Sequence, residues 1–156
     1  MPIVSGMESY SDPRQDLADA ERAAAAPYVD YPPTPVWYPP AVGVWTGALV
    51  AVMGIDTDVI RYPSLVVLIG LEVLFITWYR RLRGVTPSLR RAPREIAREM
   101  RLYAGWAVLV LLAVLGAYAL DLVLAVVTAT VLVTVGLTVY ERRYARAAAA
   151  TRSRLA

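Results

Sequence analysis

The longest apolar segment of the chain is LYAGWAVLVLLAVLGAYALDLVLAVVTATVLVTVGLTVY, residues 102–140, and its only charged residue is Asp121, near the centre. As a single helix this segment would extend about 58 Å, nearly twice the roughly 30 Å hydrocarbon core of a bilayer. We therefore predict that it folds back on itself at Asp121, whose carboxylate caps the second helix at the water interface. The two halves predict membrane spans at about 102–119 and 122–140.

Two further apolar segments precede this one. Residues 41–55 would form a helix of only about 22 Å, so Trp37 and Tyr38 must supply an interfacial end. The next segment contains one charge, Glu72. We predict spans at about 37–55 and 60–79, and hence an all-α integral membrane four-helix bundle.

Composition supports this class of protein over a soluble one. Hydrophobic residues make up 58% of the chain, charged residues 19%, and the mean hydropathy is +0.48. A soluble four-helix bundle would need polar outer faces, whereas the segments 108–115 and 122–127 are apolar on all sides. All the basic residues are arginine and alanine is abundant, which indicates a GC-rich bacterial genome.

The residue types that are missing exclude many kinds of chemistry. Without cysteine or histidine the chain has no disulfide, thiol nucleophile, Ser-His-Asp triad or conventional zinc or haem site. No phosphate-binding, dinucleotide-binding or metalloprotease motif is present, and Asp56 with Asp58 makes only a weak pair of carboxylates. We therefore expect no catalytic residues, no cofactor and no metal, and interpret the protein as a non-enzyme.

Arginine placement predicts the topology and the domain organisation. Arginines crowd the link 80–101 and the basic tail 143–156, whereas the two opposite connections hold only Arg61. By the positive-inside rule the link and both termini face the cytoplasm of a bacterial inner membrane. Residues 1–34 are polar and are predicted to be a largely disordered tail with a short helix over 13–26. The prolines of 27–40 predict an extended connector into a transmembrane domain that spans 35–142.

The cytoplasmic link has a pattern of its own. From Ser88 to Tyr103, apolar residues recur every three or four positions among arginines. This predicts an amphipathic basic helix, begun or interrupted near Pro93, that lies along the anionic inner leaflet. Nucleic acid is the other partner that an arginine run can indicate, but a segment held between two spans is better explained by lipid. The arginines assigned to lipid headgroups are Arg90, Arg91, Arg94, Arg98 and Arg101.

Glu72 is the one ionisable residue predicted to lie inside the hydrocarbon region. It precedes Arg80 by eight positions, which places it about 12 Å from the cytoplasmic interface. The same depth in the neighbouring spans predicts hydrogen-bonding neighbours at Trp45, Thr46 and Thr134. A carboxyl group there either takes part in proton coupling or, when protonated, bonds to a neighbouring helix and stabilises packing.

Small and hydroxyl residues repeat along two of the spans. Gly43 and Gly47 are four positions apart in the first, and Thr130, Thr134 and Thr138 share one face of the fourth. Such residues let helix backbones approach closely. We predict that they pack helices within the chain, with a homodimer as the alternative.

These features support two main hypotheses about function. The first is a non-enzymatic accessory or scaffold subunit whose cytoplasmic arms meet a membrane-protein partner, a cytoplasmic partner or lipid. The second is a proton-coupled carrier or channel for a small solute, assembled as a homo-oligomer around Glu72. A membrane-embedded enzyme stands third, because no catalytic constellation supports it.

Overall fold

The computed structural model describes residues 13–30, 34–83 and 92–155, and within them the chain is all-α. This confirms the all-α part of the predicted fold class for the described part of the chain. The helices are α1 (Pro13–Val29), α2 (Tyr38–Met53), α3 (Asp58–Arg83), α4 (Arg94–Tyr118) and α5 (Leu122–Leu155). The predictions for residues 1–12 and 84–91 fall outside the described residues.

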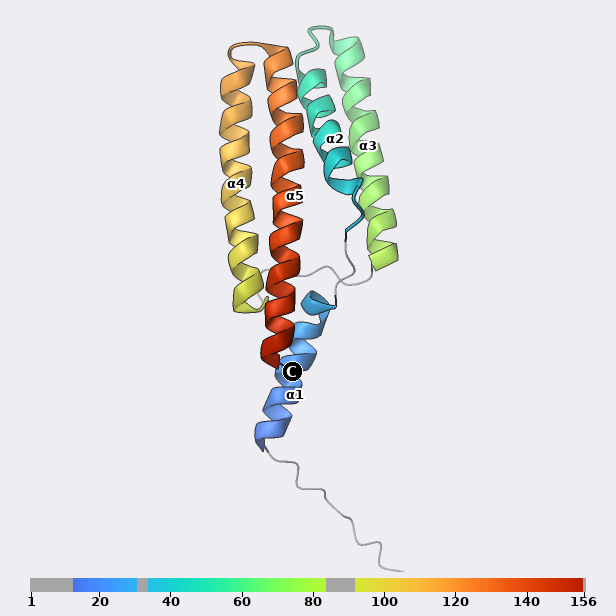
Figure 1. Ribbon diagram of the computed structural model, residues 1–156. Helices are drawn as coiled ribbons and strands as arrows, with labels where there is room; N and C mark the ends of the chain where they lie inside the picture. Colours follow the sequence, from blue (N-terminus) through green and yellow to red (C-terminus); the bar gives the residue numbers. More distant parts are fainter. Residues whose placement is uncertain (1–12, 31–33, 84–91, 156) are drawn as a thin grey trace, which may run out of the picture.

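Helix α5 is the central element of the fold. It packs along both α2 and α4, and its C-terminal part contacts α1, while α3 packs mainly against α2. Figure 1 shows α4, α5, α2 and α3 running side by side, with α1 below them beside the end of α5. Helix α3 therefore lies at the outer side of α2, and its most apolar stretch has no buried residue.

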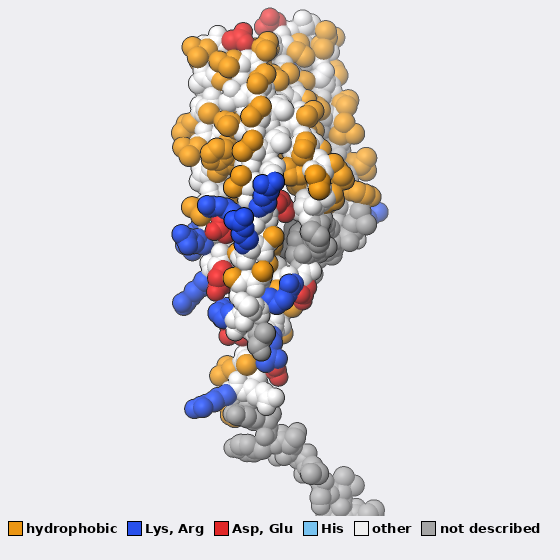
Figure 2. Space-filling model, in the orientation of Figure 1, with side chains coloured by type: hydrophobic (Ala, Val, Ile, Leu, Met, Phe, Trp, Pro, Cys, Tyr) orange, Lys and Arg blue, Asp and Glu red, His pale blue; other side chains and the backbone are white. Residues whose placement is uncertain are grey.

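In the part of the chain that the structure describes, three helices are long and apolar enough to cross a membrane, namely Asp58–Arg81, α4 and α5. Helix α2 is also apolar but has only 16 residues, about 24 Å. Large apolar side chains are exposed on these helices, for example Val66 at 70% and Val123 at 69%. In Figure 2 apolar side chains cover the upper part of the visible face, and most charged side chains gather below them. This is the pattern of a membrane protein rather than of a soluble domain.

Both connections at the end of the fold away from α1 are short turns. Gly54 to Thr57 joins α2 to α3, and Ala119 to Asp121 joins α4 to α5. Oδ1 of Asp121 accepts a hydrogen bond from the backbone N–H of Leu124 at 2.9 Å. This carboxylate therefore caps α5, as the sequence predicts.

A seam of small residues joins α2 to α5. Gly43 lies against Thr134 and the carbonyl of Thr130, and Gly47 lies against the Thr130 side chain. A Cβ at Gly43 would overlap Oγ1 of Thr134 and come 2.6 Å from the Thr130 carbonyl oxygen. The threonine hydroxyls donate to carbonyls of their own helix, as Thr138 does to Thr134 at 2.8 Å. The two helices are therefore close because glycine leaves room for a threonine.

Beyond the apolar region, α1 packs against the first turns of α4 and the last turns of α5. We call this part of the fold the cap, and its core consists of Tyr28, Ile96 and Ala148. Ile96 is completely buried, and the hydroxyl of Tyr144 donates to the carbonyl of Tyr28 at 3.0 Å. The predicted tail 143–156 is thus largely the continuation of α5.

The cap corrects two expectations drawn from the sequence. The prolines of 27–40 suggested an extended connector, but α1 continues through Pro27 to Val29 because Tyr28 is buried against α4 and α5. The link was expected to form a separate helix along the headgroups. Instead, residues 94–101 are the first turns of the continuous helix α4, and the apolar side chain of Ile96 is covered by protein.

Candidate functional site

Aromatic rings hold the first turn of α2 against the last part of α3. Tyr38 stacks on Tyr79 with ring centroids 5.7 Å apart, and on Phe75 at 6.0 Å. Trp37 meets Phe75 edge-on at 6.4 Å, and Phe75 also contacts Trp78 at 5.9 Å. These contacts fix the antiparallel register of the two helices, since they place the start of α2 opposite residues 75–79 of α3.

That register brings Glu72 and Trp45 to the same level. Glu72 precedes Tyr79 by seven positions and Trp45 follows Tyr38 by seven, so both lie two helical turns further into the apolar region. Both side chains line a cleft of about 410 Å³ between α2 and α3. The cleft is completed by Trp37, Tyr38, Ala41, Val42, Leu71, Phe75 and Ile76.

Glu72 is only partly exposed in this cleft, and none of the residues that the structure describes forms an ion pair or hydrogen bond with its carboxylate. Nε1 of Trp45 is buried and has no acceptor within the described chain. A carboxylate surrounded by rings and aliphatic groups can offset its lost hydration by binding a cation.

Only one of the three neighbours predicted for Glu72 lines its cleft. Trp45 does, whereas Thr46 lines a separate cleft beside α4 and donates its hydroxyl to the Val42 carbonyl at 2.8 Å. Thr134 faces Gly43 across the α2–α5 seam. The depth of a residue gives its level along a helix, but its face depends on a rotation of about 100° per residue. Thr46 and Thr134 therefore face other parts of the fold and not the cleft that contains Glu72.

The predicted headgroup arginines occupy the start of α4 as far as the structure describes them. Arg94, Arg98 and Arg101 are exposed there, and Nε of Arg101 donates to the Ala97 carbonyl at 3.3 Å. Arg90 and Arg91 lie outside the described residues. The headgroup role of these arginines stays a prediction.

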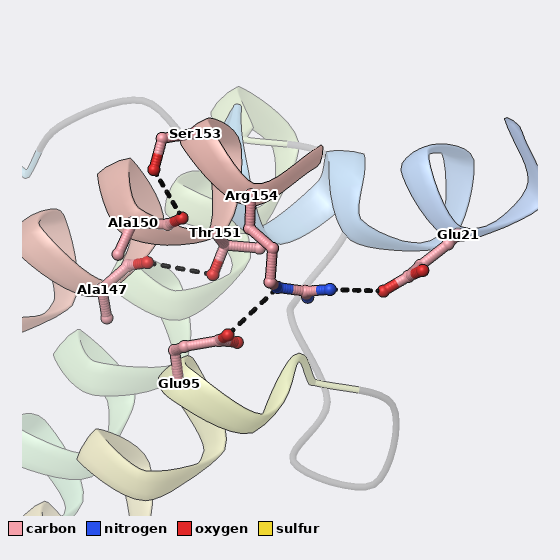
Figure 3. A network of polar contacts seen from close by, with 7 residues as sticks. All are labelled: Glu21, Glu95, Ala147, Ala150, Thr151, Ser153 and Arg154. Atoms are coloured by element: carbon pink, nitrogen blue, oxygen red, sulfur yellow. Dashed lines mark hydrogen bonds and ion pairs between the residues drawn. The ribbon is translucent and has the colours of Figure 1, made fainter. Parts of the chain in front are cut away.

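Other arginines fasten the cap. Arg154 bridges two helices, with NH1 2.7 Å from Oε1 of Glu21 in α1 and Nε 3.2 Å from Oε1 of Glu95 in α4 (Figure 3). The hydrogen bond to Glu21, followed by the nearby carboxylate of Glu95, raises the pKa of the Arg154 guanidinium. Arg152 donates to the Val29 carbonyl at 2.9 Å. These contacts join three helices at one point.

Two features of this arrangement were missed in the sequence. Phe75 lies three positions after Glu72 and so shares its helix face, a spacing that could have indicated a ring beside the carboxylate. The docking of α1 leaves a weaker signal, because most of its apolar positions are alanine.

Metal sites and similar proteins were the remaining sources of information about function. Among residues 13–30, 34–83 and 92–155, no group of three or more acidic side chains is placed to hold a metal ion. Comparison with family models, curated proteins and solved structures found no match to this chain.

Proposed function

We propose that the chain is a multi-pass protein of a bacterial inner membrane, that α2, α3, α4 and α5 each cross it once, and that both termini are cytoplasmic. Between the flanking charges, α4 offers about 26 Å of uncharged helix and α5 about 28 Å, close to the thickness of the hydrocarbon core. The arginines of α4 and α5 lie at the end that carries the cap, which supports a cytoplasmic cap.

This topology is testable with reporter fusions. Alkaline phosphatase inserted at Asp56, in the α2–α3 turn, should be active, because that enzyme needs the periplasm. The same reporter after Ala156 should be inactive, whereas a fluorescent protein should mature there. Active phosphatase at both places would mean that an even number of the helices α3, α4 and α5 cross the membrane, and it would contradict the proposed topology.

Within this topology we propose a non-enzymatic accessory or scaffold subunit. The observation that carries the proposal is the cap, in which α1, α4 and α5 form a small core and an ion-pair network outside the apolar region. A rigid polar projection on a membrane anchor is suited to holding a cytoplasmic partner or the cytoplasmic part of a membrane complex. The chain then contributes position and orientation to its partner.

The test is the native mass of the protein after gentle solubilisation from its own membranes. We expect a complex that contains a second chain in fixed stoichiometry, and we expect that chain to be lost when Ile96→Glu disrupts the cap. The matched control is Val66→Ile, on the exposed face of α3, which should leave the complex intact. Repeated recovery of this chain alone would contradict the subunit role.

A carrier or channel that uses Glu72 is the second candidate, favoured by the position of that carboxylate in the α2–α3 cleft without an ion-pair partner in the described chain. One chain has little room for a solute pathway, so an oligomer is required. Proteoliposomes should then show solute flux driven by a pH gradient, and Glu72→Gln should abolish it. Equal flux in the Glu72→Gln variant would exclude this role.

A further inference from the structure

The cleft between α2 and α3 combines a carboxylate with several aromatic rings. Glu72 shares it with Trp37, Tyr38, Trp45 and Phe75. The face of an aromatic ring carries a negative potential, and an ionised carboxylate adds a full negative charge. Both kinds of group attract a cation, and in the described chain no arginine is paired with Glu72 to satisfy that attraction.

The rest of the lining determines which cations fit. Ala41, Val42, Leu71 and Ile76 are aliphatic and offer no polar atom from their side chains. A small, strongly hydrated ion would lose its water there without replacement ligands. A cation that carries apolar substituents has little hydration to lose and gains contact with the rings. The volume of about 410 Å³ is within the range of sites for small molecules.

We propose that the α2–α3 cleft binds a lipophilic organic cation, of the quaternary ammonium or phosphonium class, with Glu72 as counter-ion and the aromatic rings as walls. Binding here requires neither a scaffold partner nor transport. It would also define the substrate class of the carrier that forms the second candidate function, and in that sense it rests on the same carboxylate.

Cations of this class reach a membrane site from two sources, free solute and the choline headgroup of a lipid. Glu72 is eight residues from Arg80, or about 12 Å along α3 from the arginine-rich end. A headgroup would have to sink by that distance into the apolar region. The geometry therefore points to a free cation.

The experiment uses the full chain in nanodiscs of phosphatidylethanolamine, with tetraphenylphosphonium as the probe in equilibrium dialysis. Tetraphenylborate has the same shape and the opposite charge, and it serves as the matched ligand. We expect saturable binding of the phosphonium with a stoichiometry near one and no saturable binding of the borate. Equal binding of the two ions would overturn the proposal, since partition into lipid would then explain both.

Three variants test which residues are responsible. Glu72→Gln should weaken phosphonium binding by at least about ten-fold, and Phe75→Leu by about three-fold, because one loses the counter-ion and the other a ring. Asp56→Asn removes a carboxylate at the exposed α2–α3 turn and should leave binding unchanged. Circular dichroism verifies that each variant is folded. Unaltered affinity in folded Glu72→Gln would refute the site.

Nanodiscs of phosphatidylcholine separate the two sources of cation. Equal affinity in both lipids supports a free cation, whereas weaker phosphonium binding in phosphatidylcholine would mean that choline headgroups compete for the cleft and would overturn that part. The binding measurement also tests the site separately from the proposed functions. Saturable binding without flux in proteoliposomes would leave the site standing and remove the carrier.

Discussion

The contact between α2 and α5 makes a quantitative prediction about two glycines. A methyl group at Gly43 would lie 2.6 Å from the carbonyl oxygen of Thr130, which belongs to the backbone and cannot rotate away. Ordinary contact begins near 3.5 Å, so α2 would have to move by about 1 Å. Overpacking of this kind costs about 1–3 kcal/mol. We predict that Gly43→Ala lowers the free energy of unfolding by about 2 kcal/mol relative to a matched glycine substitution elsewhere.

The chain provides its own controls. A Cβ at Gly70 or Gly116 would meet no atom within 4 Å, apart from each glycine's chain neighbours and local helix backbone. Alanine at either position is the same substitution without the clash, and it increases helix propensity. Unfolding is followed by circular dichroism while sodium dodecyl sulfate is titrated into dodecylmaltoside micelles. The difference between Gly43→Ala and Gly70→Ala then isolates the packing cost.

Gly47 distinguishes a side-chain clash from a backbone clash. Its Cβ would overlap Oγ1 of Thr130, but the next nearest atom is the Val126 carbonyl oxygen at 3.3 Å. Thr130→Ala should therefore rescue Gly47→Ala, with a coupling energy of about 1 kcal/mol or more. The corresponding rescue of Gly43→Ala by Thr134→Ala should be incomplete, because the 2.6 Å contact with a carbonyl persists. Gly43→Ala as stable as Gly70→Ala would refute the close approach of the two helices.

Three further changes probe the turn, the α4–α5 contact and the cap. Asp121→Ala removes the hydrogen-bond acceptor at the start of α5 and should destabilise the fold by about 1 kcal/mol. An unchanged midpoint of unfolding by detergent would contradict the N-capping role of Asp121. Gly136→Ala places a Cβ 2.6 Å from Cδ1 of Trp106, so we expect about 1–3 kcal/mol of destabilisation and altered tryptophan emission; a wild-type spectrum would argue against the contact. Folding raises the pKa of Arg154. The stabilisation from its charge is therefore fully present at any pH below the pKa of the unfolded chain, and it is lost only as the pH rises through the pKa of the folded chain, far above neutrality. Hydrogen-exchange rates of α1, corrected for intrinsic rates, should therefore be the same at about pH 7 and about pH 9. They should increase in about 1 M salt and in the Arg154→Gln variant. Exchange rates that respond to neither change would contradict the ion pairs.

The sequence was sufficient for features that depend on local pattern. The fold-back at Asp121 follows from the length of one apolar segment, and the structure has a turn there, with Asp121 as the N-cap of α5. The spacing of Gly43 and Gly47 identified a helix face suited to close packing, and that face meets Thr130 on α5. Both inferences needed only one helix at a time.

Features that depend on how helices face one another were not accessible in this way. The rotation of α2 decides that Trp45 and not Thr46 meets Glu72, and this rotation is set by ring contacts of Tyr38 with α3. The position of α1 depends on a few buried groups such as Tyr28 and on ion pairs between residues more than a hundred positions apart. Hydrophobic periodicity contains no record of such distant pairs.

The uninterrupted length of α5 has a mechanical consequence. Its 34 residues extend about 51 Å, so about 20 Å of the same rigid rod projects past the apolar region and ends against α1. A tilt of roughly 10° within the lipid would move the projecting end sideways by about 3 Å, enough to disturb its contacts with α1. A small change in the tilt of α5 within the bilayer would thus displace the end of the helix that contacts α1.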